Sequence, residues 1–238
     1  MNQTALITGG SKRLGKAISL EVAKKGYNIA LHYNSSQIDA ENTKKEIKEF
    51  GVDCKTFKCD LSDINQVLKL IPKVSYEMPD LTVLVNNASI FDDIKFTDVT
   101  PDFFDKDFTI NFKSPFFLTQ TFAKNTKKGQ VINLLDTRVN RTTTQHFVYN
   151  LSKKSLYNFT RMAAKELAPD IRVNGICPGP ILPPPGKDEK YLTDIIKVVP
   201  LKMIGNIEVV LKAFNYLFEN NFVTGECLFV DGGKHLNY

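Results

Sequence analysis

The sequence predicts an α/β fold in which one doubly wound domain holds a parallel seven-stranded sheet with helices on both faces. Three observations support this prediction. Short apolar runs alternate along the chain with longer segments of helical period, as in successive βαβ units. Most of the short runs are apolar at nearly every position, which is typical of strands covered on both faces. No repeat, linker or low-complexity segment divides the 238 residues, so one domain over residues 1–238 is expected.

The elements follow from these runs in chain order. The predicted strands are "TALIT" (4–8), "NIALHY" (28–33), "CKTFKC" (54–59), "LTVLVN" (81–86), "QVINLL" (130–135), "IRVNGI" (171–176) and "CLFV" (227–230). Helices are predicted between them near 13–25, 38–50, 63–77, 102–126, 147–168 and 206–220. The stretch "PGPILPPPGKDEK" (178–190) is too rich in proline for a helix or a strand and interrupts the alternation.

The composition limits the classes of function. No apolar run approaches the roughly 18 residues of a membrane-spanning helix, and "MNQT" passes into "ALITGG" without a leader, so we expect no membrane partner and a cytoplasmic location. The net charge of +5 is spread over short or mixed-sign runs, which argues against a nucleic-acid partner. The four scattered cysteines form no CxxC pair and only three histidines accompany them, so we expect buried reduced thiols and no metal site.

A glycine-containing turn, "TGGSKRLG", follows the first strand. Small residues at a strand-to-helix turn let backbone N–H groups approach a pyrophosphate. The strict G-x-G-x-x-G spacing is absent, and Arg13 stands where a middle glycine is expected, so the glycines taken alone could mark a simple turn. The guanidinium favours an anionic ligand. We therefore predict a nucleotide site that includes Gly9, Arg13, Leu14 and Gly15.

The end of the second strand indicates which nucleotide binds. Sites for NAD usually place an acidic residue there to hold the ribose 2′-hydroxyl. Here the stretch "LHYNSS" has no acid and several hydrogen-bonding groups, with Lys12 and Arg13 expected nearby, so NADP is predicted over NAD. A polar loop without cofactor contacts remains the alternative for each of these positions, which are His32, Tyr33, Asn34, Ser35 and Ser36.

Tyr149 and Lys153 lie four residues apart in a predicted helix and so share one face of it. A nearby cation favours the phenolate form of a tyrosine, which makes the pair usable for proton transfer. The Y-x-x-x-K spacing by itself is common and does not establish a site.

Together these blocks resemble the short-chain dehydrogenase/reductase family over nearly the whole chain. The resemblance is carried by "TGGSKRLG", "CDLS" (59–62), "LVNNAS" (84–89), "IN" (110–111), "YNLSK" (149–153), "IRVNGICPGP" (171–180) and "TGECLFVDGG" (224–233). It implies a Rossmann fold and an NADP-dependent oxidoreductase with Tyr149 as proton donor. It also implies that Lys153 holds the nicotinamide ribose and lowers the pKa of Tyr149, and that Asn111 assists.

The resemblance implies further cofactor contacts and a substrate-flanking loop near 178–200. Asp60 is expected to contact the adenine, and Asn87 and Ala88 to line the cofactor groove. The other cofactor contacts expected from these blocks are Leu61, Ser89, Pro178 and Gly179.

One position departs from the usual pattern of the family. Most members place a serine at the end of the fifth strand to donate to a substrate carbonyl, and this chain has Asp136 there. Thr137 is next, but alternation along a strand directs it to the opposite side. A carboxylate cannot donate unless protonated, yet it can accept from an amino or ring N–H. The alternative reading of Asp136 is a simple turn residue.

A pterin offers such N–H groups, and the chain resembles the pteridine reductase and dihydromonapterin reductase branch of the family. In that branch an aspartate accompanies the Tyr-Lys pair, and an aromatic ring sandwiches the pterin against the nicotinamide, a place that Phe91 takes here. Phe91 could instead be a loop-packing residue.

Two other functions remain open at this stage. A reductase of 3-oxoacyl carrier proteins or other ketones would use Thr137 in place of the serine, and a non-catalytic NADP-sensing protein would keep the fold without turnover. Helices 102–126 and 147–168 carry more apolar residues than one sheet face can cover, and the resemblance implies that they pair into a homotetramer.

Overall fold

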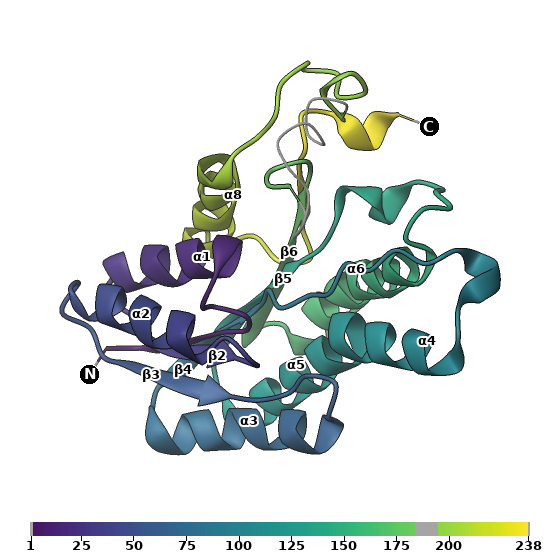
Figure 1. Ribbon diagram of the computed structural model, residues 1–238. Helices are drawn as coiled ribbons and strands as arrows, with labels where there is room; N and C mark the ends of the chain where they lie inside the picture. The colour runs from purple at the N-terminus through teal and green to yellow at the C-terminus, as the bar shows by residue number, and fades with distance from the viewer. Residues whose placement is uncertain (1, 184–194, 238) are drawn as a thin grey trace.

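The computed structural model describes residues 2–183 and 195–237 and contains a parallel sheet of seven strands (Figure 1). The strands are β1 (Thr4–Ile7), β2 (Asn28–Tyr33), β3 (Cys54–Lys58), β4 (Leu81–Asn86), β5 (Gly129–Leu134), β6 (Ile171–Pro178) and β7 (Cys227–Val230). Their order in the sheet is β3-β2-β1-β4-β5-β6-β7, and every neighbouring pair is parallel. The predicted fold class and all seven predicted strands are confirmed.

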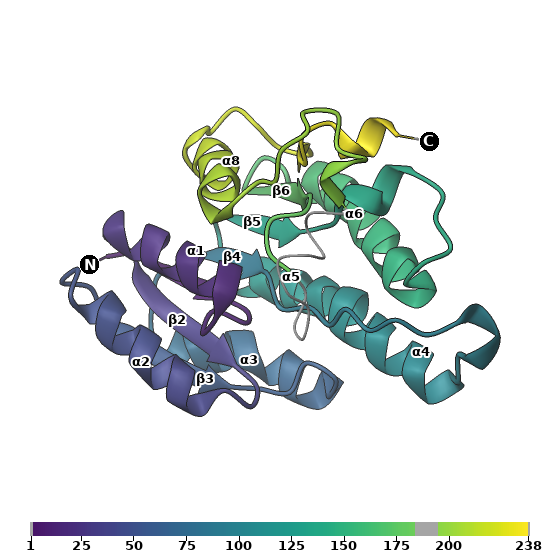
Figure 2. The same ribbon diagram turned by 45° about the horizontal axis from the view of Figure 1, so that its top comes forward.

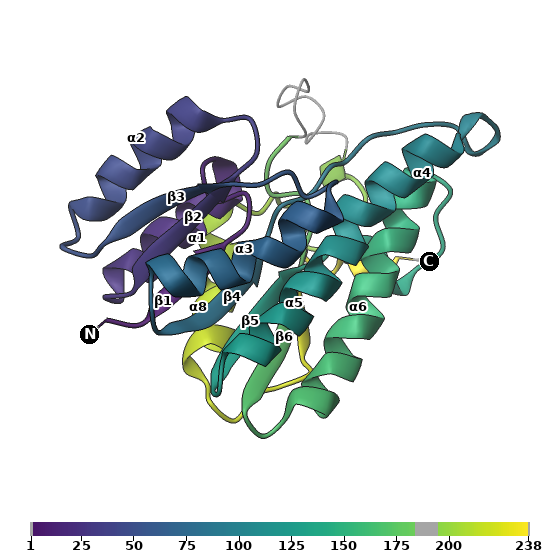
Figure 3. The same ribbon diagram turned by 90° about the horizontal axis from the view of Figure 1, so that it is seen from below.

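Helices cover both faces of the sheet because each strand is apolar on both sides. One face is covered by α1 (Arg13–Lys24), α2 (Gln37–Lys48) and α8 (Ile207–Glu219), and the other by α3 (Ile64–Glu77), α5 (Ser114–Asn125) and α6 (Phe147–Leu167). Figure 3 shows α3, α5 and α6 together on the second face. Two buried clusters result, with Phe214 of α8 in the first and Phe122 of α5 in the second, both fully buried.

The long helix predicted for 102–126 is present but is not uniform. It begins with α4 (Pro101–Phe108), passes through a π-helical turn at Thr109–Lys113 and continues as α5. The Thr100 side chain caps its start by accepting a hydrogen bond from the Phe103 N–H at 3.2 Å. π turns inside α-helices are frequent at functional sites, and this one contains Asn111.

The strand order places a crevice above the middle of the sheet. After β1 the chain adds β2 and β3 on one side, and β4 returns to the other side of β1, so the order reverses between β1 and β4. Doubly wound sheets bind their ligands at the carboxyl ends of the strands beside such a reversal. In Figure 2, β4, β5 and β6 lie side by side next to this point.

Several other predictions concern groups away from the crevice. All four cysteines are buried and free, as predicted, and burial raises the pKa of the Cys54 thiol to about 12. In the part of the chain that the structure describes, no helix has the length and apolar character needed to cross a membrane. Within the same residues, no three His, Cys, Asp or Glu side chains are grouped so as to hold a metal ion. Residues 184–190 of the proline-rich stretch lie outside the described residues.

Candidate active site

The turn between β1 and α1 is held in a shape that requires glycine. Gly9 has a φ of +61°, and a Cβ on Gly15 would lie 2.1 Å from the Gly9 carbonyl oxygen. The Asn87 side-chain amide, from the end of β4, donates to the Thr8 and Gly9 carbonyls at 2.9 and 3.2 Å. Thr8 Oγ accepts from the backbone N–H groups of Asn87 and Ala88 at 2.9 and 3.0 Å. These contacts fix the turn against the neighbouring strand.

His32 supports the same turn from below. Its Nδ1 accepts the Gly9 N–H at 2.9 Å, and its Nε2 lies 3.0 Å from the Cys59 carbonyl oxygen. The side chain is buried, and burial lowers the pKa of His32 to about 4 against the opposing effect of the Cys59 carbonyl. Both ring nitrogens are thus used inside the protein. The predicted cofactor contact at His32 stays a prediction, while its side chain supports the β1–α1 turn.

The other residues predicted at the end of β2 divide into two groups. Tyr33 is buried and packs in the first core cluster, so its side chain belongs to the core. Asn34 and Ser35 are exposed, and Ser36 is half-buried at the N-terminus of α2, where its side chain makes no capping hydrogen bond. Asn34, Ser35 and Ser36 therefore remain candidates for cofactor contacts.

The predicted pair Lys12 and Arg13 points in two directions. Lys12 forms an ion pair with Asp39 in the first turn of α2 at 2.8 Å, which places its ammonium beside the end of β2. The Arg13 guanidinium instead donates to the Pro183 carbonyl at 2.6 Å and lines the central cavity. The contact of Arg13 with a 2′-phosphate stays a prediction, and Lys12 is a cation placed on the side of β2.

The N-terminus of α1 fits a dinucleotide pyrophosphate. Lys12, at the N-cap, makes no side-chain capping bond, and the first turn of α1 contains no acidic residue. The first N–H groups of a helix have no partner within it and carry a partial positive charge. Because a side chain at Gly15 would collide with the backbone, close approach of a ligand to this turn needs the glycines that are present.

The remaining residues predicted to contact the cofactor differ in which of their atoms can face the crevice. Asp60 accepts from the Ser62 N–H and hydroxyl at 2.9 and 2.8 Å, at the end of β3. The Leu61 side chain is buried in the second core cluster, so only its backbone can face a ligand. Gly179 lies against Asp231, where an added Cβ would lie 2.5 Å from the Asp231 Cα.

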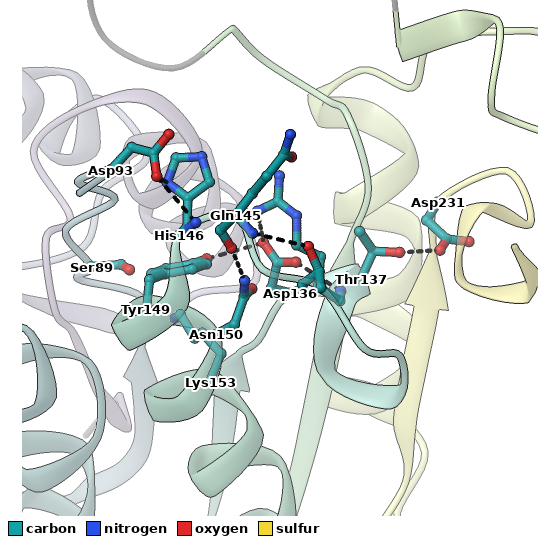
Figure 4. A network of polar contacts seen from close by, with 12 residues as sticks. Ser89, Asp93, Asp136, Thr137, Gln145, His146, Tyr149, Asn150, Lys153 and Asp231 are labelled. Carbon is teal, nitrogen blue, oxygen red and sulfur yellow. Dashed lines mark hydrogen bonds and ion pairs between the residues drawn. The ribbon is translucent and has the colours of Figure 1, made fainter. Parts of the chain in front are cut away.

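Asp136 and Tyr149 come together at the carboxyl end of β5 (Figure 4). The Tyr149 hydroxyl donates to Asp136 Oδ2 at 3.1 Å, and the Arg138 backbone N–H donates to Asp136 Oδ1 at 2.8 Å. Asp136 thus acts as the N-cap of the short 3₁₀ turn Thr137–Asn140, and it also belongs to the cluster around Tyr149. The turn role of Asp136 is observed through Oδ1, and its role in binding substrate stays a prediction, with Oδ2 placed beside the Tyr149 hydroxyl.

Lys153 lies one helical turn from Tyr149, as the spacing predicted. Its ammonium donates to the Leu134 carbonyl at 2.7 Å and lies 5.8 Å from the centre of the Tyr149 ring. Burial lowers the pKa of Lys153 to about 8, and the charge of Asp136 opposes this shift. A lysine with three donors and one occupied keeps two for a ligand.

Tyr149 is held in its protonated form. Burial raises its pKa well above the usual value, the charge of Asp136 raises it further, and the opposing effect comes from Arg138. Burial and the Asp136 carboxylate outweigh the lowering effect of Arg138 on the pKa of Tyr149, and the predicted effect of Lys153 on that pKa stays a prediction. A protonated phenol is the form that donates a proton.

Arg138 was not predicted from the sequence. Its guanidinium lies 3.7 Å from Asp136 Oδ2 and 5.2 Å from the centre of the Phe91 ring, and the residue is only 9% exposed. A buried arginine needs a charged or aromatic partner, and Arg138 has both. Its position two residues after Asp136 was the available signal.

Asn111 occupies the π turn and is fully hydrogen-bonded. Its Oδ1 accepts from the Ser89 hydroxyl at 2.8 Å and the Ile90 N–H at 3.1 Å. Its amide donates to the Ile90 carbonyl at 3.1 Å and to Asp107 Oδ1 at 3.0 Å. Burial raises the pKa of Asp107, whose Oδ2 is buried without a hydrogen-bond partner among the described residues. Asn111 thereby positions the segment that carries Phe91.

Phe91 lies beside Tyr149, and one face of its ring is covered. His146 stacks on it with ring centres 3.8 Å apart and planes 20° apart, and Tyr149 meets its edge with ring centres 4.8 Å apart. His146 is fixed by the Asp93 carboxylate, which accepts its backbone N–H at 3.1 Å. A planar ligand could stack on Phe91 only at the face that His146 does not cover, and the Arg138 guanidinium also lies over this ring, 5.2 Å from its centre.

Thr137 is directed away from this cluster, as alternation predicted. Its hydroxyl donates to Asp231, and Figure 4 shows the side chain pointing toward Asp231 and away from Tyr149. A substrate carbonyl beside Tyr149 would thus find no hydroxyl donor from Thr137.

A cavity of about 570 Å³ joins these parts. It is lined by ten of the predicted residues, which are Arg13, Leu14, Asn87, Ser89, Phe91, Asp136, Tyr149, Lys153, Pro178 and Gly179. Lining residues that the sequence reading missed include Arg138, Ile181 and Lys234. Asn111 and the glycines of the β1–α1 turn support the cavity from outside.

Known proteins resemble this chain over its whole length. A family model described as Enoyl-(Acyl carrier protein) reductase matches residues 10–235. General stress protein 39 of Bacillus subtilis is 32% identical, with 98% of this chain and 84% of that protein covered. The 3-oxoacyl-[acyl-carrier-protein] reductase FabG of Staphylococcus epidermidis is 28% identical, with 99% and 100% covered.

Among solved structures, FolM alternative dihydrofolate reductase 1 from Brucella canis, complexed with NADP, superposes with a TM-score of 0.94 and 33% identity, covering 100% of this chain and 95% of the other. A blue fluorescent protein from a metagenomic library, in complex with NADPH, gives a TM-score of 0.91 and 29% identity, covering 98% and 97%. With the family model matched from residue 10 to 235 and the fold and Tyr-Lys cluster in place, the chain belongs to the short-chain dehydrogenase/reductase family.

Proposed function

We propose that the protein is an NADPH-dependent reductase whose substrate is a pterin or dihydropterin ring. The observation that carries the proposal is the carboxylate of Asp136, which stands 3.1 Å from the catalytic Tyr149 hydroxyl where the family usually has a hydroxyl donor. An acceptor at that place suits a substrate that presents N–H groups. The solved relative named as an alternative dihydrofolate reductase, with NADP bound, supports both the ring class and the cofactor.

The residues present can hold the cofactor. The uncapped N-terminus of α1 suits the pyrophosphate, and the two unused donors of Lys153 suit the nicotinamide ribose. Ser35, Ser36 and Lys12 suit a 2′-phosphate at the end of β2. NADPH, when bound, supplies the hydride of the reduction.

The chain itself supplies orientation and a proton. Tyr149 remains protonated because its pKa is raised, so it can donate to a ring nitrogen of the substrate. Asp136 uses one position on each oxygen for Tyr149 and the Arg138 N–H, and a carboxylate has about four such positions. The remaining positions can accept substrate N–H groups. Phe91 would stack on the substrate ring with the face that His146 does not cover.

Steady-state turnover with purified variants tests this function. NADPH oxidation would be followed with dihydropterins, dihydrofolate and a 3-oxoacyl thioester. Asp136→Ser removes a charged acceptor, and a hydrogen bond to a charged group is worth about 1.5–3 kcal/mol, so pterin kcat/KM should fall about 10- to 150-fold. Tyr149→Phe should lose about 10²–10⁴-fold in kcat while NADPH still binds.

Asp136→Asn is the matched control, because it keeps the shape and one acceptor but removes the charge. It should retain more pterin activity than Asp136→Ser. Unchanged pterin reduction in Asp136→Ser would reduce the carboxylate to its N-cap role and remove the main support for a pterin.

A ketone reductase is the second candidate, favoured by the 28% identity to a 3-oxoacyl carrier-protein reductase over 99% of this chain. Faster turnover of the thioester than of any pterin by the unmodified enzyme would establish it. An absence of turnover with every substrate, combined with tight NADPH binding, would favour the NADP-sensing alternative.

A further inference from the structure

A second, larger cavity adjoins the active site on the side of Arg138. Its volume is about 950 Å³, and Arg138, Ile195 and Lys234 line both cavities. The described residues that line it include five cations, Arg138, Arg141, Lys197, Lys202 and Lys234, and none of the described lining residues is Asp or Glu. A ligand in the active-site cavity can therefore extend into a strongly basic space.

Three of these cations are held close to one another by two short turns. Arg138 and Arg141 belong to the turn that follows Asp136, and Lys234 begins the 3₁₀ turn Lys234–Leu236 after β7. Lys234 is 7% exposed and Arg138 is 9% exposed. Arg141 Nε is buried and makes no hydrogen bond within the described residues.

The charges of these cations lower one another's pKa values. Burial lowers the pKa of Lys234 to about 8, and the charges of Arg138 and Arg141 lower it further. Burial also lowers the pKa of Arg141, followed by the charge of Arg138. Asp136 and Asp231 oppose both shifts, yet they do not cancel them.

Among the described residues, the two nearby carboxylates are already engaged elsewhere. Asp136 accepts from Tyr149 and from the Arg138 backbone N–H. Asp231 accepts from the Thr137 hydroxyl, from the Gly233 N–H at 3.0 Å and from the His235 N–H at 2.7 Å. Partly buried cations without a hydrogen-bonded counter-charge are costly, and an anion placed between them would remove that cost.

We propose that the natural substrate carries an anionic group on a side chain that extends from its ring, and that Arg141 and Lys234 bind this group in the basic cavity. The inference rests on the proposed function for the ring itself. Arg138 lies between the two sites, since its backbone N–H donates to Asp136 and the residue lines both cavities. Carboxylate and phosphate share the required chemistry, and the substrate panel separates these two sources.

Turnover of ring-matched substrates tests the inference. Three substrates would share a dihydropterin ring and differ in side chain: dihydrobiopterin, which is uncharged there, dihydrofolate, which carries carboxylates, and dihydroneopterin phosphate. Arg141→Gln should lower kcat/KM for one or both anionic substrates about 10- to 150-fold, mainly through KM. The same variant should change kcat/KM for dihydrobiopterin by no more than about twofold. The KM for the preferred anionic substrate should also rise with ionic strength.

Two further variants make the result specific. Arg141→Lys keeps a positive charge and should recover part of the loss. Lys212→Gln removes a cation from the exposed face of α8, where Lys212 pairs with Glu208 at 3.1 Å, and should change nothing. Equal losses on charged and uncharged substrates in Arg141→Gln, or no loss on either anionic substrate, would overturn the inference.

Binding without turnover separates this inference from the proposed function. Calorimetric titration of the NADP-bound protein with p-aminobenzoylglutamate and with inorganic phosphate probes the cavity alone. Binding of either probe that disappears in Arg141→Gln and persists in Lys212→Gln supports the anion site even if no pterin is reduced. Pterin reduction with no binding of either probe would leave the proposed function standing and refute the anion site.

Discussion

Acidification is expected to destabilise the protein through the buried imidazole of His32. The ring links the β1–α1 turn to the end of β3, since Nδ1 accepts the Gly9 N–H and Nε2 faces the Cys59 carbonyl. An amide N–H can only donate, so Nδ1 must be unprotonated and the hydrogen must sit on Nε2. A second proton on Nδ1 would point at the Gly9 N–H and break that bond.

The size of the effect follows from the pKa. The pKa of His32 falls from 6.5 to about 4 in the folded protein. Between these values the unfolded chain binds a proton that the folded chain does not, so the stabilisation present above pH 6.5 is lost as the pH falls toward 4. At about 1.4 kcal/mol per pH unit, the loss amounts to about 3 kcal/mol, a large part of the stability of an ordinary domain.

Urea unfolding of the protein and of His32→Gln, each at neutral pH and near pH 4, measures this contribution. The variant should be less stable at neutral pH because it loses packing and a hydrogen bond. Its free energy of unfolding should nevertheless fall by about 3 kcal/mol less than that of the unmodified protein on acidification. Equal losses in both proteins would refute the reasoning, as would a His32 ring resonance that titrates near pH 6.5 in NMR spectra.

Two further predictions concern the cofactor and the assembly. NADPH should bind at least about tenfold more tightly than NADH, because a charge-assisted contact is worth about 1.5–3 kcal/mol. Lys12→Ala should reduce this difference in affinity, whereas Arg13→Ala should weaken the binding of both cofactors. Equal affinities of the unmodified protein for NADPH and NADH in a titration would contradict the prediction. The face of α5 and α6 around Phe159 and Met162, the latter 71% exposed, should mediate self-association. Met162→Asp should shift the mass measured by sedimentation toward the 26.9 kDa of one chain. If the unmodified protein sediments only as a 26.9 kDa species at micromolar concentration, the predicted self-association is wrong.

The fold could be predicted because strand and helix periods are local properties of the sequence. Each of the seven apolar runs formed a strand, and only their ends shifted by a residue or two. The π turn at Thr109–Lys113 could not be predicted, because its cause is tertiary: Asn111 must reach Ile90 and Asp107 together. Local period cannot report a contact between segments about twenty residues apart.

Site residues could be predicted where their relation depends on sequence spacing. They could not be predicted where their role depends on which side chains the fold buries. Tyr149 and Lys153 lie on one helix, so their separation fixed their relation. His32 was predicted to contact the cofactor, with a polar loop as the alternative, although it lies within the predicted strand 28–33, and a central parallel strand is covered on both faces. The same rule that identified the strand therefore implied a buried histidine with both nitrogens occupied.

The basic cavity shows why the substrate side of the site escapes sequence analysis. Arg138 and Arg141 precede Tyr149 in the chain, whereas Lys234 lies near its far end, and each appears as an isolated cation in a weakly basic sequence. They converge because β5 and β7 end at the same edge of the sheet and each is followed by a short 3₁₀ turn. Under the proposed function, the fold would place the ring at Tyr149, and these turns would determine what can be attached to it. A change at Arg141 should therefore alter which substrate is preferred without altering the reaction at Tyr149.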